Sequence, residues 1–136
     1  MPWDGSPGSG FTGPGVTPWL PMADPPGTTV ADQRDKPEST LSLCRRLLAL
    51  RRAELGRGLA DFENLAVTEG VWTYRTGPLV VAANFTDRPA DMPAEAGEVL
   101  LTTSAGQAPP SPRVLRPWEG TVTRRSGGAR PAPGTR

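Results

Sequence analysis

The stretch VWTYRTGPLVVAANF, residues 71–85, decides how the second half of this 136-residue chain folds. Residues 71–76 and 78–85 are rich in the β-branched and aromatic side chains that favour strands. Two further candidate strands follow, at 97–104 and at 113–124, and the second is broken near Pro117. Residues 62–67 are a shorter candidate. Four to six antiparallel strands within about 65 residues predict a small β-sandwich or meander.

Before these strands, the apolar spacing changes to that of a helix. In PESTLSLCRRLLALRRAEL, residues 37–55, a step of about 100° per residue places the apolar side chains on one half of the circumference. These are Leu41, Leu43, Cys44, Leu47, Leu48, Leu50 and Leu55. An apolar arc this wide is typical of a helix that packs on a sheet. Pro37 suits the first turn, Asp35 or Ser39 suits the N-cap, and Gly56 can end the helix.

The two ends of the chain differ in composition from the centre. Residues 1–29 hold seven Pro and six Gly, and the end of the chain reads RRSGGARPAPGTR. We therefore divide the chain into a loop at 1–36, a helix at 37–57, a β-domain at 58–124 and a disordered tail at 125–136. The loop nevertheless carries large apolar side chains, which rarely stay in water. They are Trp3, Phe11, Trp19 and Leu20.

Composition excludes several classes of function. A net charge of +1 gives no electrostatic case for nucleic acid or for an anionic membrane. The absence of His removes the commonest general base and metal ligand, so we expect no metal and no cofactor. Cys44 is the one cysteine, and its place in the Leu stripe predicts a small core residue rather than a nucleophile. No apolar secretory segment is evident, and we expect a cytoplasmic, bacterial protein. The excess of Arg over Lys is interpreted as the coding bias of a GC-rich genome.

Several short elements follow one another in a characteristic order. They are MPWD at 1–4, GF at 10–11, PWLP at 18–21, the set Gln33, Pro37, Ser39 and Leu41, and LLALRR at 47–52. This order resembles the end of the α-glucosidase and oligo-1,6-glucosidase group of the α-amylase superfamily. The resemblance is specific over the first 55 residues and continues more loosely, through the strand patterns, to about residue 124.

This resemblance implies an architecture. The catalytic body of the family is a (β/α)8 barrel, and the chain would supply its last βα unit: the rim loop after the eighth strand, then the eighth helix, followed by the C-terminal β-domain. Met1 would be an internal methionine of the family motif. The fold class expected is thus an α+β fragment whose missing barrel is its partner. Trp3, Asp4, Phe11 and Trp19 are the substrate-proximal candidates in the parent enzyme.

For each candidate a plain structural role is the preferred interpretation. We expect Trp3 and Trp19 to pack the loop rather than to stack on sugar, because burial is the usual role of an indole. Asp4 is expected to accept hydrogen bonds from loop amides, as Asp commonly does before Gly. Asn84 begins a glycosylation sequon, Asn84-Phe85-Thr86, but a turn bond at the end of a strand is the better reading.

The catalytic machinery is expected to lie elsewhere. Retaining glycosidases need a nucleophile and an acid, and the family's three catalytic carboxylates all precede residue 1 in the resemblance. No catalytic residue is therefore assigned here, and the local Asp and Glu residues are expected to be solvated. The expected function is the catalytically incomplete C-terminal portion of a glycoside hydrolase acting on α-glucosides, with the β-domain in a structural role and the substrate bound only by the complete enzyme. Two alternatives stay open: a stand-alone β-domain that binds carbohydrate or a partner protein, and a parent that is a trehalose synthase or related transglycosidase.

Overall fold

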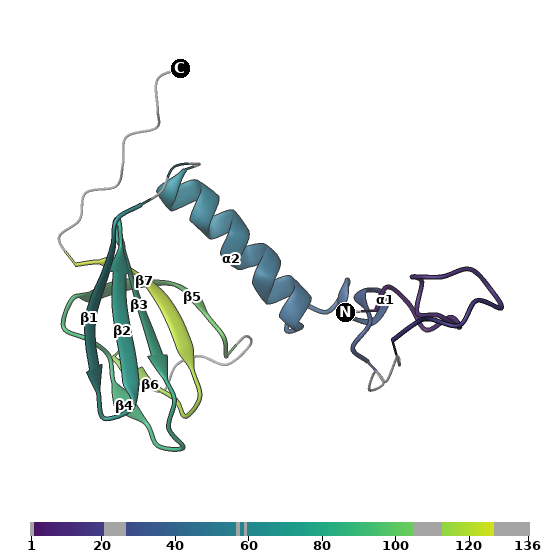
Figure 1. Cartoon of the computed structure of the whole chain (residues 1–136). Helices are drawn as coiled ribbons and strands as arrows, with labels where there is room; N and C mark the ends of the chain where they lie inside the picture. Colours follow the sequence, from purple (N-terminus) through teal and green to yellow (C-terminus); the bar gives the residue numbers. More distant parts are fainter. Residues whose placement is uncertain (1, 21–26, 57, 59, 105–112, 127–136) are drawn as a thin grey trace. The chain divides into compact units, whose positions relative to one another are not determined.

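The computed structural model describes residues 2–20, 27–56, 58, 60–104 and 113–126. They form two compact units, Met1–Arg46 and Leu47–Arg136, whose boundary lies within a long helix (Figure 1). The expectation for Met1 lies outside the described residues, as does that for the tail from residue 127 on. The start of the tail, predicted at 125, is wrong, because Arg125 ends the strand Gly120–Arg125. None of the helices in the described ranges has the length and apolar character needed to cross a membrane.

The helix expected from the Leu spacing is α2, Thr40–Leu55. It begins at Thr40 rather than at Pro37, because the preceding residues form a turn in which the Ser39 amide donates to the Lys36 carbonyl over 3.1 Å. Of the two caps considered, Ser39 is used: its hydroxyl accepts from the Ser42 amide at 3.2 Å. Gly56, at φ +66°, ends the helix as expected, with its amide bonded to the Arg52 carbonyl.

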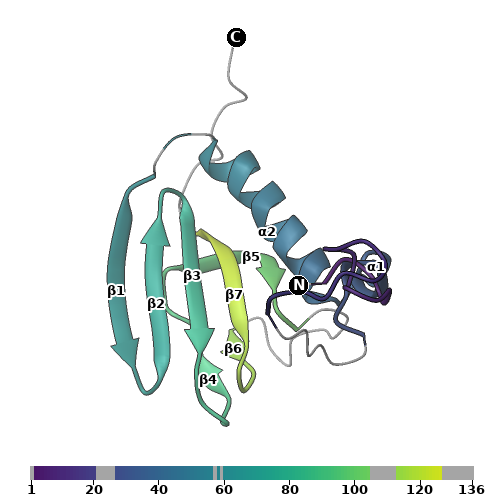
Figure 2. The ribbon, with the colours of Figure 1, turned by 45° about the vertical axis from the view of Figure 1, so that its right-hand side comes forward.

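The β-domain contains every strand that the sequence predicts and one more. The strands are β1 Phe62–Thr68, β2 Val71–Thr76, β3 Leu79–Asn84, β4 Ala90–Asp91, β5 Ala96–Thr102, β6 Val114–Leu115 and β7 Gly120–Arg125. Five of them form an antiparallel sheet in the order β1-β2-β3-β7-β5, and β4 pairs with β6 (Figures 1 and 2). The predicted break near Pro117 separates β6 from β7.

The core of the β-domain lies between the two sheets. Val71 and Ala82 on the larger sheet meet Leu115 of β6, and Ala90 and Met92 pack against this cluster. Leu115 has no exposed surface. The prediction of a small antiparallel sandwich is confirmed: the short β4–β6 pair packs against the five-stranded sheet, near its lower end in Figure 2.

The other face of the large sheet meets the end of α2 through a few contacts. Glu54 pairs with Arg124 of β7 at 2.7 Å. At Gly77, in the two-residue β2–β3 turn at φ +53°, a Cβ atom would come within 2.9 Å of Leu55. A hollow of about 310 Å³ between helix and sheet is lined mainly by apolar side chains, Leu48 and Phe62 among them.

Helix α2 buries little of its Leu stripe within this chain. None of its residues is buried, and Leu48 is 55% exposed. The expectation that Cys44 is a core residue is therefore wrong for the described structure, because Cys44 is exposed. The helix has the apolar face that the sequence shows, but the described residues supply no surface that covers all of it.

Candidate functional site

The candidate residues of the N-terminal loop lie in a closely hydrogen-bonded turn. The Asp4 carboxylate accepts from the Ser6 hydroxyl at 2.5 Å and from the Ser6 amide at 2.9 Å. These two bonds, the hydroxyl first, lower the pKa of Asp4 below its ordinary value. The expectation that Asp4 holds loop amides is confirmed, and the side chain is an ionised acceptor in an Asx turn rather than a proton donor.

The backbone on either side of Trp3 is fixed by a short helix that sequence reasoning missed. This helix is α1, Val30–Gln33, capped by Thr29. Its first two amides, of Val30 and Ala31, donate to the Pro2 and Trp3 carbonyls at 2.8 and 3.0 Å. The Trp3 amide donates to Ser9 at 2.9 Å. The loop therefore satisfies the free amides at the start of α1, and α1 in turn anchors Trp3.

Three of the loop residues come together because of Gly10. Gly10 has φ +74°, and a Cβ atom there would lie 2.7 Å from the Trp3 Cβ and 3.2 Å from an Asp4 oxygen. Trp3 and Asp4 thus lie directly against the Gly10 backbone, with Phe11 next in the chain. The structure gives no contact that brings Trp19 into this group.

The aromatic rings of the loop are exposed although the backbone is ordered by hydrogen bonds. Trp3 is 56% exposed, Phe11 is similar, and Trp19 is 90% exposed. Within the described residues, therefore, most of the surface of these rings meets no neighbour. Large exposed aromatic side chains on a loop whose backbone is ordered by hydrogen bonds are suited to contact with another surface or with a ligand.

Gln33 joins the loop to the long helix. Its side chain donates to the Thr28 carbonyl at 2.8 Å and accepts from the Leu41 amide at 3.1 Å. The Ser39 hydroxyl donates to its main-chain carbonyl at 2.8 Å. Gln33 is buried, and its bonds connect Gln33, Ser39 and Leu41, three residues of the motif in this sequence.

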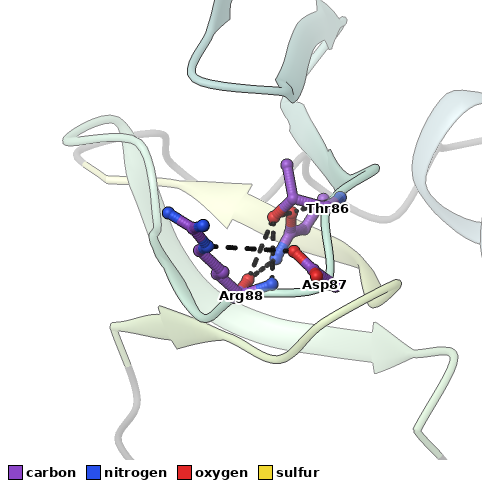
Figure 3. A network of polar contacts seen from close by, with 4 residues as sticks. Thr86, Asp87 and Arg88 are labelled. Atoms are coloured by element: carbon purple, nitrogen blue, oxygen red, sulfur yellow. Dashed lines mark hydrogen bonds and ion pairs between the residues drawn. The ribbon is translucent and has the colours of Figure 1, made fainter.

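A second group of polar residues lies at one end of the β-domain, around the buried Asn84. Its carboxamide oxygen accepts from the Thr86 amide at 3.0 Å and from the Thr86 hydroxyl at 2.7 Å. Its nitrogen donates to the carbonyls of Arg88 and Arg116 at 2.7 and 2.9 Å. Figure 3 shows how these bonds hold the loop that carries Thr86, Asp87 and Arg88. The expectation that Asn84 makes turn bonds is confirmed.

Glu119 is the residue that sequence reasoning missed. It is buried, and its carboxylate accepts from the Thr102 hydroxyl at 2.5 Å and the Arg116 amide at 2.7 Å. Burial raises the pKa of Glu119, but these bonds, with Ser104 and the charge of Arg116, outweigh burial, so the pKa lies below its ordinary value. Glu is rarely buried. The sequence signal near Glu119 was Pro117, two residues earlier, which indicates a turn.

The chemistry of these groups is that of hydrogen-bond acceptors. Among the described residues, three carboxyl groups have a shifted pKa, Asp4, Asp32 and Glu119, and each is shifted downward, which keeps the group ionised. A general acid needs the opposite shift. In the described ranges no group of three or more His, Cys, Asp or Glu residues is arranged to hold a metal ion.

One protein-family model matches part of the chain. Residues 60–122 match the family model described as "Domain of unknown function (DUF3459)", which stands at the C-terminal end of α-amylase-family enzymes. A search of curated protein sequences gives no match.

Solved structures match over nearly the whole chain. A trehalulose synthase from Pseudomonas mesoacidophila MX-45 is 23% identical, with a TM-score of 0.71 over 91% of this chain. An isomaltulose synthase from Klebsiella sp. LX3 is 22% identical, with a TM-score of 0.69 over 91%. An isomaltulose synthase variant from Erwinia rhapontici NX5, solved with its natural substrate sucrose, is 22% identical, with a TM-score of 0.69 over 90%. The chain spans 24% of the length of each of these structures.

The structural match includes the loop and α2 as well as the β-domain, because it extends well beyond residues 60–122. At these identities the match shows the fold. The family model covers residues 60–122, and the structural match extends the shared fold over about nine-tenths of the chain.

Proposed function

We propose that this chain serves as the C-terminal portion of a glycoside hydrolase-type enzyme that processes α-glucosides, and that it is catalytically incomplete alone. The observation that carries the proposal is the exposed apolar surface of the loop and α2. A helix of 16 residues with a Leu stripe and no buried residue is typical of an element that packs against a larger body. In this proposal the body is the barrel of the parent enzyme.

The β-domain has a structural role in this proposal. Its core is internal, between the two sheets, and its buried polar groups Asn84 and Glu119 are satisfied by turn and strand-end atoms. Such a domain can hold the last barrel helix in place through contacts such as Glu54–Arg124. The catalytic carboxylates belong to the barrel, so the substrate is bound only by the complete enzyme.

The activity of the parent enzyme has two candidates. The resemblance in the sequence favours α-glucoside hydrolysis. The structural neighbours favour a transglycosidase, since they are synthases of trehalulose and isomaltulose, and one was solved with its natural substrate sucrose. The cytoplasmic location expected from the sequence stays a prediction.

The first test is to read the DNA upstream of the codon for Met1. We expect an in-frame or frameshifted sequence of the same family, ending in Arg-Thr-Pro or close to it. The chain alone should match the buffer blank with a chromogenic α-glucoside, maltose and sucrose. The chain joined to its upstream barrel should turn over at least one of them. Upstream sequence unrelated to the family, or turnover by the repurified chain alone, would contradict the proposal.

A Trp3 variant of the chain joined to its upstream barrel can distinguish the two candidate roles of Trp3. If Trp3 packs against the barrel, Trp3→Ala should lower the free energy of unfolding by about 3–5 kcal/mol and leave the kinetics of the folded enzyme nearly unchanged. If Trp3 contacts sugar, kcat/KM should fall about tenfold or more while the melting temperature stays constant. We expect the first result for Trp19 as well as for Trp3.

A further inference from the structure

The hollow between the end of α2 and the larger sheet has an apolar floor. Its volume is about 310 Å³, and all of its lining lies within the compact unit Leu47–Arg136. Leu79 and Val122 in this floor are buried, whereas Phe62 is 62% exposed. Part of the floor is therefore accessible from outside. Two cross-strand rows of the sheet form it, Phe62, Thr76 and Leu79 in one row and Tyr74, Val81 and Val122 in the other.

The helical wall of the hollow carries a charge among its leucines. The α2 residues that line it are Leu47, Leu48, Leu50, Arg51 and Leu55. At about 100° per residue, Arg51 falls between Leu47 and Leu55 on the circumference of the helix, inside the apolar arc. Arg51 is exposed in this chain. A surface that covered these leucines would therefore cover the guanidinium group as well.

The described part of the chain supplies no carboxylate to Arg51. The one acid of α2, Glu54, pairs with Arg124 at 2.7 Å, and Arg124 also pairs with Glu98 at 2.6 Å. Among the described residues, no ion pair or hydrogen bond is made by the Arg51 side chain. Burial of an unpaired charge is costly. The surface that covers this arc therefore has to supply an anion.

We propose that the hollow receives one Asp or Glu side chain from an otherwise apolar surface of the body that covers α2, and that its carboxylate pairs with Arg51. The volume is near the lower limit of the roughly 300–1,000 Å³ of ligand pockets, which suits one side chain better than a longer segment. A guanidinium group can bond both carboxylate oxygens, and Arg is enriched at the energetic centres of interfaces. That this body is the barrel rests on the proposed function.

A second copy of the chain is a poorer occupant of the hollow. Packed through the same arc, it would bring a second Arg51 to the contact, while its Glu54 is already paired. Like charges that meet in an interface are destabilising. Sedimentation of the chain checks this alternative: we expect no dimer that depends on the hollow. A dimer that octanoate dissociates would identify the second copy as the occupant and overturn the proposal.

The test is an NMR titration of the full chain with octanoate, which shares an apolar stem and a terminal carboxylate with the proposed side chain. The reporters are the methyl groups of Leu47, Leu48, Leu50 and Leu55 and the Nε–H group of Arg51. Octylammonium, which has a similar stem and the opposite charge, is titrated in parallel. We expect saturable shifts with octanoate and at least about tenfold weaker binding of octylammonium. No saturable shift with octanoate, or equal binding of both, would overturn the proposal.

Variants of two neighbouring arginines locate the effect. Arg51→Met keeps an apolar stem without the charge and should weaken octanoate binding about tenfold or more. Arg51→Lys keeps the charge and should weaken it less. Arg52→Met is the matched control, because Arg52 is exposed on the same helix but does not line the hollow. It should bind octanoate as the wild type does. Unchanged binding by Arg51→Met, or an equal loss in Arg52→Met, would contradict a pair with Arg51.

The complete enzyme gives a second measurement. In the chain joined to its upstream barrel, Arg51→Met should lower the melting temperature more than Arg52→Met does, because it leaves the carboxylate of the barrel unpaired. Equal melting temperatures of these two variants would reject the pair.

Failure of the carboxylate site and failure of the proposed function are distinguishable. If octanoate does not bind but the upstream sequence belongs to the family, only the carboxylate site is rejected. If octanoate binds through Arg51 and the upstream sequence is unrelated, the site stands and the barrel is not the source of its carboxylate.

Discussion

The β-domain and the segment formed by the N-terminal loop with α2 satisfy their polar and apolar groups differently. The β-domain has an internal core in which groups of both kinds find partners: Leu115 and Val80 are buried, and the Thr123 hydroxyl donates to the Val80 carbonyl. In the loop and helix the backbone is bonded, but rings such as Trp19 and side chains such as Leu48 are exposed.

This difference indicates which region lacks a surface that buries its apolar side chains. Backbone hydrogen bonds can shape a segment locally, while the burial of apolar side chains stabilises it against the unfolded chain. The β-domain has both terms and the loop has mainly the first. We therefore infer that, in the chain alone, substitutions of apolar residues have large effects in the β-domain and small effects in α2.

The largest effect is expected for Leu115→Ala, which removes the centre of the core cluster. Leu→Ala at buried sites lowers the free energy of unfolding by about 2–5 kcal/mol. The matched substitution Leu48→Ala, on α2, should change it by less than about 0.5 kcal/mol. Urea unfolding of the chain alone measures both. Similar losses at the two positions would break the comparison, because they would show that α2 is packed as firmly as the core.

The second effect concerns the buried carboxylate of Glu119. Glu119→Gln replaces one acceptor oxygen by an amide that faces the Thr102 and Arg116 donors, and should cost about 1–3 kcal/mol at pH 7. The pKa of Glu119 in the folded chain is below its ordinary value of 4.5. Its stabilising contribution is therefore complete above pH 4.5 and is lost as the pH falls below that value.

Urea unfolding at several pH values checks this prediction. The wild type should lose stability on acidification more steeply than Glu119→Gln, and the difference between them should narrow toward about pH 3. A difference that stays constant with pH would mean that the ionised carboxylate is not the stabilising form. Asp4 and Asp32, whose pKa values are also lowered, account for some of the slope that both proteins share.

Local patterns in the sequence were sufficient to predict the β-strands but not how they pair. The segments at 71–76 and 78–85 are rich in side chains that favour strands and meet at the turn residue Gly77, and β2 and β3 form there. The position of β7 between β3 and β5 depends on contacts far apart in the chain. β4 has only two residues, too few for a pattern.

In the candidate site, too, the sequence predicted local features but not contacts between residues far apart in the chain. Motif order placed Trp3 and Asp4 in one loop, and turn chemistry predicted the role of Asp4 correctly. The exposure of Cys44 was missed because an apolar stripe indicates which face is buried only when its partner is present. The burial of Glu119 was missed because it depends on Thr102, which is 17 residues earlier in the chain.

The smallest effect sharpens the comparison within the loop, where backbone geometry is expected to be the main constraint. Gly10→Ala places a methyl group 2.7 Å from the Trp3 Cβ at φ +74°. This should cost about 1–2 kcal/mol of local stability. Gly5→Ala is the control, since a Cβ atom there meets nothing within 4 Å. Hydrogen exchange of the Trp3 and Phe11 amides, both bonded within the loop, should become about tenfold faster in the first variant and stay unchanged in the second. Urea unfolding of the β-domain should be the same in both.

If Gly10→Ala instead lowers the urea midpoint of the β-domain, the loop and the β-domain unfold together, and the loop is then stabilised by more than its own hydrogen bonds. If exchange at both amides is equally fast in the wild type and in both variants, the loop bonds are open most of the time, and the loop would then depend on the barrel of the proposed function for its conformation as well.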